Sequence, residues 1–193
     1  MKERKKLRLK KWLSALTAGV LLSTTLMFAG VANAEGQTST MADESIYDLL
    51  VDRFFNGTGK NDDKQVNAQD PEMFAGGDFN GLIKKVDYIG NMGYTVVSIG
   101  SVFTTEKYDG SMITSYEAIE PRFGTEEELQ NVINTYQHRD MKIVIDFPLS
   151  NVSPNHEWAT EAGFVATTNE QIQWDLSNTA VQDQLIESAT AFV

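Results

Sequence analysis

The stretch IYDLLVDRFF, residues Ile46–Phe55, decides how the rest of the chain is interpreted. It is a nearly continuous apolar run that ends in a charged pair, and we expect it to form a buried strand. Two later stretches have the same character, YTVVSI at Tyr94–Ile99 and MKIVIDF at Met141–Phe147, and the last carries an acid near its C-terminal end. The sequence therefore predicts three buried strands, far enough apart to leave room for a helix between successive strands.

The segments between these strands have the apolar spacing of helices. Leu82–Met92 repeats apolar residues every three or four positions, and Gly93 is placed to end that helix. Thr125 precedes Glu128 by three positions, which predicts a capping box and a helix that continues to about Gln137. The order strand, helix, strand, helix, strand predicts a parallel sheet covered by helices.

A long polar loop follows the first strand. Residues Asn56–Asp78 are rich in Asn, Asp and Gly, whereas a nucleotide-binding sheet has a short Gly-rich turn at this point. We therefore expect a barrel rather than a doubly wound sheet, with functional side chains in the loops at the carboxyl ends of the strands. Further along, the apolar spacing in Val181–Val193 predicts another amphipathic helix.

The N-terminal segment has the features of an export signal. Residues 2–11 carry seven Lys or Arg side chains and one Glu, residues 12–31 are mostly apolar, and residues 32–34 (ANA) supply the small residues of a cleavage site. We therefore expect residues 1–34 to be a signal peptide, residues 35–44 a disordered linker, and the mature protein to be secreted without stable membrane association. The alternative is a transmembrane anchor, since the apolar run is nearly long enough to span a bilayer.

The charge balance argues against one class of partner. The chain has 16 Lys and Arg residues against 27 Asp and Glu residues, a formal net charge of −11, and removal of the predicted signal makes the remainder more acidic. An acidic surface repels phosphates, so nucleic acid is not an expected partner, although the acidity could equally serve solubility alone. The chain has no cysteine, so an exported form must be stabilised by core burial or by bound metal.

The loop after the first strand holds the oxygen donors that a hard cation needs. Asn56, Asn61, Asp62 and Asp78 supply amide or carboxylate oxygens, and Gly76 can offer a backbone carbonyl. The spacing is not that of an EF-hand, because the Glu at its last ligand position is missing. From the chemistry alone, a calcium site and a plain flexible turn both stay open.

Four motifs occur in order along the chain, and together they resemble a known family. They are DRFFNG at residues 52–57, GGDFNG at 76–81, YDG followed by IEPRFGT at 108–125, and IVIDF at 143–147. In this order they resemble the first three strands and loops of the α-amylase family, glycoside hydrolase family 13. The resemblance implies an α/β fold, the N-terminal part of a (β/α)8 TIM barrel with the beginning of an inserted domain B after the third strand.

The resemblance also implies domain boundaries and a metal. Residues 45–152 would hold the first three barrel strands, residues 153–178 the domain B-like insertion, and residues 179–193 a truncated barrel helix. A calcium ion would join the first loop to the second. The positions that match its ligands are Asn56, Thr58, Asn61, Asp62, Gly76 and Asp78, where Thr58 replaces an Asn that is common in the family.

Two predicted sugar-binding residues follow the third strand. Asp146 matches the aspartate of the family's first conserved region, which orients the active-site base and helps to shape the sugar subsite. Asn151 stands where the family has a histidine that hydrogen-bonds the sugar beside the scissile bond. A nearby loop histidine, His156, is expected at the surface.

Two more predicted sugar-binding residues, Tyr108 and Asp109, follow the second strand. In many members a tyrosine stacks under the sugar at the position of Ser111, so this platform is lost unless Tyr108 or Tyr116 replaces it. The departures at Ser111 and Asn151 both affect the subsite where the transition state forms.

The activity implied for the complete protein is hydrolysis of α-1,4-glucosidic bonds in starch-like polysaccharides by a retaining mechanism, with an α-glucan or maltooligosaccharide as substrate. That mechanism needs two carboxyl groups, a nucleophile and an acid/base. In the family they follow the fourth and fifth strands, and the expected G-x-R-x-D motif does not occur here, so we expect the sequence to be an inactive fragment without catalytic residues. The alternatives are a cyclodextrin-type transglycosylase and a catalytically degenerate carbohydrate-binding homologue.

Overall fold

The computed structural model describes residues 41–150, 152–168 and 170–191. The predicted signal peptide, most of the predicted linker and Asn151 lie outside these residues. At the end of the predicted linker, Met41–Asp43 forms a 3-10 turn, η1, and the Glu44 carboxylate forms an ion pair with Lys142. Within the described part of the chain, no helix is both long and apolar enough to cross a membrane.

A three-stranded parallel sheet lies at the centre of residues 41–150, as predicted. Its strands are β1 (Ile46–Leu49), β2 (Val96–Ile99) and β5 (Lys142–Ile145), in the order β1-β2-β5. Leu49 pairs with Ile99, which pairs with Ile145, so all three strands end at the same edge of the sheet. The loops that follow them therefore start side by side.

The first strand is shorter than its apolar run predicts. The chain leaves the sheet after Leu49 and forms a helical turn, α2 (Val51–Phe54). This turn directs the Asp52 carboxylate inward, where it accepts hydrogen bonds from the backbone N–H groups of Ala75 and Gly76. The need to pair these buried N–H groups overrides the strand propensity of the run.

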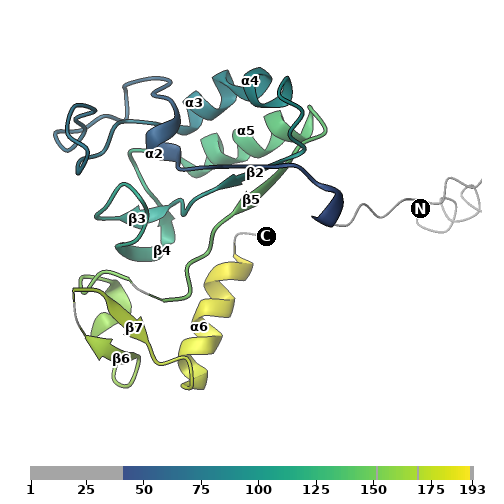
Figure 1. The fold of residues 1–193 in the computed structure, drawn as a ribbon. Coiled ribbons are helices and arrows are strands. Elements are labelled where there is room, and N and C mark those ends of the chain that lie inside the picture. Colours follow the sequence, from purple (N-terminus) through teal and green to yellow (C-terminus); the bar gives the residue numbers. More distant parts are fainter. Residues whose placement is uncertain (1–40, 151, 169, 192–193) are drawn as a thin grey trace, which may run out of the picture. The chain divides into compact units, whose positions relative to one another are not determined.

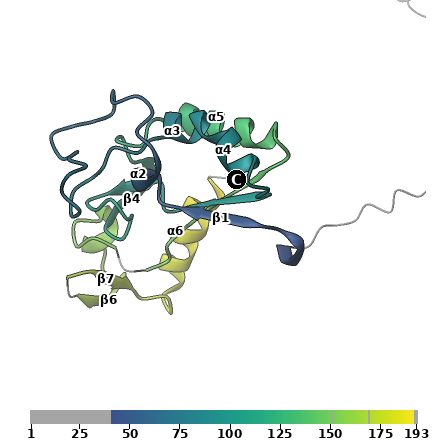
Figure 2. The same cartoon turned by 45° about the horizontal axis from the view of Figure 1, so that its top comes forward.

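Helices cover one face of the sheet (Figures 1 and 2). The predicted helix over 82–92 is divided into α3 (Phe79–Lys84) and α4 (Val86–Gly90), because the backbone at Lys85 departs from helical angles. It also begins earlier than predicted, since the Asp78 side chain caps its N-terminus. The second predicted helix, α5 (Glu126–Gln137), has the expected capping box between Thr125 and Glu128.

These helices and the sheet share one apolar core. Phe79, Leu82 and Ile89 pack with Val132 and Tyr136 of α5 and with the buried side chains of the strands. The Tyr136 hydroxyl donates to the carbonyl of Leu82 at 3.0 Å, so α3 and α5 are joined by a hydrogen bond inside this core. Burial raises the pKa of Tyr136, which keeps the hydroxyl protonated as the donor.

Two antiparallel hairpins were not predicted. The first, β3 (Phe103–Thr105) with β4 (Ile113–Ile119), follows β2; the second, β6 (Val165–Thr168) with β7 (Ile172–Trp174), follows a short 3-10 helix η2 (Glu157–Thr160). The last helix, α6 (Thr179–Thr190), begins at the Asn178 cap and confirms the predicted amphipathic spacing. Val181 and Leu185 of α6 pack with the hairpins in a second apolar cluster.

Candidate functional site

The loop Asn56–Asp78 leaves the carboxyl end of β1 and is held by carboxylates that accept backbone N–H groups. Asp78 accepts from Gly57 (3.1 Å) and Gly81 (2.6 Å) with one oxygen and from Thr58 (3.0 Å) with the other. Asp52 anchors the far end of the loop through Ala75 and Gly76. Buried carboxylates that accept several N–H groups fix a loop more firmly than neutral acceptors do.

Asp52 is buried, with 2% of its surface exposed. Burial raises the pKa of its carboxyl group, although the N–H groups of Ala75 and Gly76 and the charges of Arg53 and Arg122 act in the opposite direction. Both oxygens accept hydrogen bonds, which favours the ionised form of the carboxyl group. This role of Asp52, the first residue of the DRFFNG motif, was not predicted from the sequence.

Arg53 connects this loop to the β3–β4 hairpin. Its guanidinium donates to the carbonyls of Pro71 and Met73, both at 2.8 Å, and lies 3.7 Å from the ring centroid of Tyr108. One face of the Tyr108 ring is therefore occupied by a protein cation. A sugar would have to use the opposite face or the ring edge.

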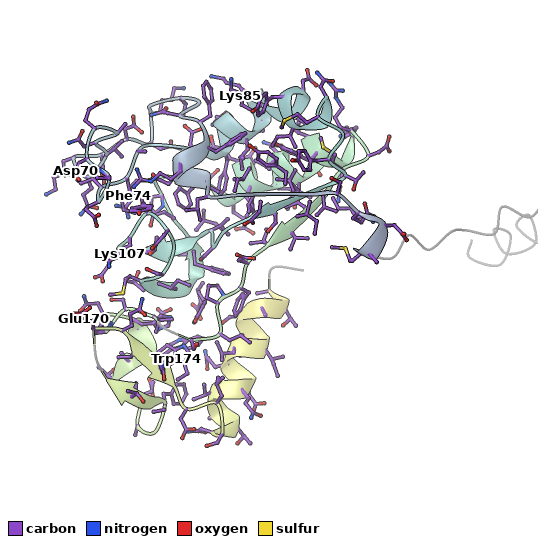
Figure 3. All side chains as sticks on the ribbon, viewed as in Figure 1. Asp70, Phe74, Lys85, Lys107, Glu170 and Trp174 are labelled. Atoms are coloured by element: carbon purple, nitrogen blue, oxygen red, sulfur yellow. The ribbon has the colours of Figure 1, made fainter. Side chains whose placement is uncertain are left out.

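A buried ion pair makes a second connection between the loop and the hairpin. Glu120 is fully buried and accepts from Arg122 Nε at 2.5 Å and from the backbone of Thr105 at 3.0 Å. Arg122 also donates to Gln65 and lies 3.6 Å from the ring centroid of Phe74, labelled in Figure 3. The structural role of this ion pair was not predicted from the sequence. The signal that could have indicated it is the occurrence of two opposite charges among the apolar residues of the IEPRFGT motif.

Three of the predicted metal residues come together. Asn56 Nδ2 donates to Asp62 Oδ2 at 2.8 Å, and a Cβ atom placed on Gly76 would lie 2.6 Å from Asn56 Nδ2 and 2.8 Å from Asp62 Oδ1. Gly76 also has a φ of +88°, so both its backbone and its surroundings require glycine. The amide of Asn61 is buried, and its Nδ2 has no partner among the described atoms.

The other two predicted metal residues serve mainly as tethers. Asp78 uses about three of its roughly four acceptor positions for backbone N–H groups, and Thr58 contributes its N–H to that carboxylate. Among the residues that the structure describes, no cluster of three or more His, Cys, Asp or Glu side chains could hold a metal. A cation in this loop would therefore also need amide and backbone oxygens.

The predicted sugar residues lie in separate elements. Asp146 is exposed directly after β5, and its backbone N–H donates to Ile99 at 3.1 Å, which continues the ladder with β2. Asp109 lies in the turn of the β3–β4 hairpin and accepts from the N–H of Ser111 at 3.0 Å. In the described part of the chain, no hydrogen bond joins Asp146 to Tyr108 or Asp109. Their roles stay predictions, as does that of Asn151.

Tyr116 is not available as a stacking platform. Its ring is fully buried and stacks on Phe147 at 5.0 Å, and its hydroxyl donates to the carbonyl of Pro148 at 2.8 Å. Burial raises the pKa of Tyr116 to about 12. The carbonyl of Ser111 accepts from Gln171 at 3.2 Å, so the position of the missing tyrosine contacts the segment between β6 and β7.

The expectation that His156 lies at the surface is wrong. Only 2% of its surface is exposed, and its ring lies about 5 Å from those of Tyr116, Trp158 and Trp174. Its Nδ1 accepts from the N–H of Trp158 at 3.1 Å, which places the ring proton on Nε2, and Nε2 has no partner among the described atoms. Burial lowers the pKa of His156 to about 4. The aromatic residues at 158 and 174 were the signal for this burial.

One pocket of about 860 Å³ lies between β4, α5 and α6. Its walls include Ile119, Leu129, Ile133, Ile145 and Ser188, and it contains none of the predicted metal or sugar residues. No residue of the loop Asn56–Asp78 lines this pocket. We therefore place the candidate site at the loops.

Comparison with known proteins identifies the family. The family model described as the α-amylase catalytic domain matches residues 48–184. The cyclomaltodextrin glucanotransferase of Niallia circulans is 30% identical over 172 residues, covering 76% of this chain and 24% of that protein. The α-amylase 2 of Schwanniomyces occidentalis is 31% identical over 166 residues, covering 81% of this chain and 31% of that protein.

A solved structure agrees with these sequence relatives. An Anoxybacillus α-amylase superposes with a TM-score of 0.73 at 30% identity, covering 78% of this chain and 38% of that structure. The chain thus spans less than half the length of each of these three proteins. The chain belongs to the α-amylase family, and its parallel strands and helices form the N-terminal part of a (β/α)8 barrel.

Proposed function

We propose that the complete protein hydrolyses α-1,4-glucosidic bonds in starch-like glucans with retention of configuration. The family match over residues 48–184 supports this proposal, and so does the position of Asp146 directly after β5, because active sites of this fold are built at the carboxyl ends of the strands. The nucleophile and the acid/base would follow the fourth and fifth barrel strands, as the family resemblance implies. This chain would contribute the sugar contacts of Asp146, Asn151, Tyr108 and Asp109.

Substitution of Asp146 tests its proposed role in binding the sugar. In the full-length protein, Asp146→Asn keeps the side-chain volume but loses the charge, and we expect starch hydrolysis to fall by about 100-fold. Asp140→Asn is the matched control, since Asp140 is exposed in the turn before β5 and should leave the rate unchanged. Equal activity of the two variants would contradict the role of Asp146.

A transglycosylase is the second candidate, because one relative is named a cyclomaltodextrin glucanotransferase. The same full-length protein, incubated with starch, separates the candidates by its products. We expect linear maltooligosaccharides; cyclic products would favour the transglycosylase. Starch binding without either product would instead favour a degenerate carbohydrate-binding homologue, which the departures at Ser111 and Asn151 motivate.

We also propose a calcium ion in the loop Asn56–Asp78. Asn56 and Asp62 meet around Gly76, and Asn61, whose Nδ2 has no partner among the described atoms, can turn its amide to offer Oδ1 instead; both observations support the proposal. A hard cation needs several oxygen ligands. An ionised carboxylate offers two oxygens, and an Asn amide can turn to present its oxygen instead of its NH2 group. The bound ion would join the start of the loop, near Asn56, to its end, near Gly76, and would stabilise the fold. We assign it no chemical step.

Calcium binding can be measured without an activity assay. Titration calorimetry of the calcium-free protein should show a site that is weakened at least tenfold by Asp62→Ala, which removes a carboxylate ligand. Asp63→Ala is the control, because among the described residues the Asp63 carboxylate accepts only the nearby N–H of Gln65, at 2.7 Å. Equal affinities in the two variants would contradict the site.

The predicted export signal adds a proposal about location. We propose that the protein is secreted after cleavage behind Ala34, because residues 1–34 combine a basic start, an apolar run and small residues at the end. N-terminal sequencing of the protein recovered from culture medium should begin at Glu35. Recovery of the uncleaved chain in the membrane fraction would favour the anchor instead.

A further inference from the structure

Two Asn–Gly pairs that are distant in sequence meet at one carboxylate. The N–H groups of Gly57 and Gly81 both donate to Asp78 Oδ1, at 3.1 and 2.6 Å. Each glycine is preceded by an asparagine, Asn56 and Asn80. Asp78 therefore holds the backbone nitrogens of both pairs.

Neither glycine can be exchanged for a larger residue. A Cβ atom on Gly57 would lie 2.2 Å from the nitrogen of Gly81, and one on Gly81 would lie 1.8 Å from the carbonyl oxygen of Phe55. The two backbone segments cross too closely for any side chain. The fold thus requires glycine after an asparagine at both places.

An Asn–Gly sequence carries an intrinsic chemical reactivity. The backbone nitrogen of the glycine can attack Cγ of the asparagine, forming a ring N–Cγ bond, while the Cγ–Nδ2 bond breaks and ammonia leaves with the glycine proton. Water then opens the ring at one of its two carbonyls, giving aspartate or isoaspartate. The reaction needs only water, and glycine favours it because no Cβ hinders the attacking nitrogen.

Three hydrogen bonds hold Asn56 out of this reaction. Its Oδ1 accepts from the N–H of Gly59 at 2.8 Å, its Nδ2 donates to Asp62 at 2.8 Å, and the attacking nitrogen of Gly57 is bound to Asp78. All three must open before Cγ can reach the nitrogen. Asn56, Gly59 and Asp62 are exposed, so the opening needs no unfolding of the core.

Asn80 is held more firmly. It lies in the first turn of α3, where the helical backbone keeps its side chain away from the next nitrogen, and its Nδ2 donates to Glu128 at 2.8 Å across to α5. Gly81 is buried, whereas Gly57 is only half-buried. The two pairs therefore have the same sequence, but the Asn56 side chain can reach the next backbone nitrogen more easily than the Asn80 side chain can.

We propose that Asn56 is a masked deamidation site, controlled by the hydrogen bonds of its loop. Conversion would replace a neutral amide by a carboxylate beside Asp62 and close to Asp78. Like charges at this spacing repel, so the modified loop is looser without a bound cation. The inference depends only on the loop's own contacts and holds whether or not the protein binds calcium or acts on glucans.

The test follows deamidation in the full chain with a chelator present. Asp62→Ala frees the Asn56 amide while leaving the Asp78 contacts in place; Asp62→Asn retains an acceptor, and Asp63→Ala is the matched control. After incubation at mildly alkaline pH, tryptic peptides 54–60 and 65–84 report Asn56 and Asn80 separately by mass spectrometry. Circular dichroism shows whether each variant is folded, and the chain in urea gives the unmasked rate.

We expect Asn56 to convert roughly two- to tenfold faster in Asp62→Ala than in the parent, which is the effect of one lost hydrogen bond. Asp62→Asn and Asp63→Ala should convert at the parent rate, and Asn80 should stay intact in every folded protein. If Asp62→Ala does not fold, the parent still tests the inference, because its Asn56 must convert more slowly than in urea. Equal rates in urea and in the folded parent, an unchanged rate in folded Asp62→Ala, or faster conversion of Asn80 would overturn it.

Discussion

The loop Asn56–Asp78 and the described residues of the segment 152–174 both follow parallel strands, yet they are held by different forces. The first is held by Asp52, Asp78 and Arg53, which bind backbone groups. The second is held by aromatic rings around His156 and Trp174. A loop held by charged hydrogen bonds depends on each single acceptor, whereas an aromatic cluster is held by apolar burial and excludes water and charge.

Removal of Trp174 should produce the largest effect on either region. The side chain is 3% exposed, packs on His156 and Trp158, and donates to the Tyr116 hydroxyl at 3.3 Å. We expect Trp174→Ala to lower the free energy of unfolding by about 4 kcal/mol, measured in urea. Leu176→Ala is the control, because Leu176 is 45% exposed and should cost little. Comparable losses in the two variants would mean that the aromatic cluster is not what holds this region.

Acid should weaken the aromatic region through His156. Burial lowers the pKa of His156 from 6.5 to about 4 in the folded chain, so only the unfolded chain binds a proton between these values. Stability from this group is complete above pH 6.5 and is lost as the pH falls towards 4, by about 3 kcal/mol in total. Urea unfolding at several pH values should show a flatter profile for His156→Gln. Parallel profiles for parent and variant would argue against this source of acid sensitivity.

Removal of Asp52 should have a somewhat smaller effect in the polar loop. Asp52→Ala leaves the N–H groups of Ala75 and Gly76 without their acceptor, and we expect a loss of about 2 kcal/mol. Asp70→Ala serves as a control in the same loop, since within the described part of the chain the Asp70 carboxylate accepts only the N–H of Glu72, two residues away. Hydrogen exchange should show faster exchange of residues 71–77 in Asp52→Ala. An unaffected loop would mean that Asp52 is not its anchor.

The smallest expected effect concerns Arg53. Arg53→Lys keeps the charge but loses the planar group that donates to Pro71 and Met73 and lies on Tyr108, and we expect about 1 kcal/mol of destabilisation. Arg139→Lys, at an exposed ion pair with Asp87, provides the comparison and should be neutral. A neutral Arg53→Lys would show that charge alone connects the loop to the hairpin.

Local sequence signals predicted the regular elements best. The Thr125–Glu128 capping box and the apolar strand ending at Ile145 are short-range features, and both are confirmed. The hairpins were missed, because β3 is only three residues long and its pairing with β4 is irregular. Such strands are defined by their partner more than by their own composition.

In the candidate site, too, some features were predicted from the sequence and others depend on distant partners. The sequence singled out Asn56, Asp62 and Gly76 as members of one site, and the structure brings them together. It did not distinguish an oxygen that is free for a ligand from one that is occupied, as at Asp78, because that depends on backbone groups contributed by Gly57 and Thr58. The metal and sugar roles stay predictions until they are measured.

By itself the sequence determined the order of the three parallel strands and their helices and the acidic charge, and its motifs identified the family. The strands, helices and charge follow from composition and periodicity, which act over a few residues, whereas the family follows from the resemblance of the motifs. Only the tertiary structure decided that His156 is buried, that Arg53 covers one face of Tyr108, and that two Asn–Gly pairs share Asp78. Those facts depend on contacts between segments distant in the chain, and packing alone decides which of them meet.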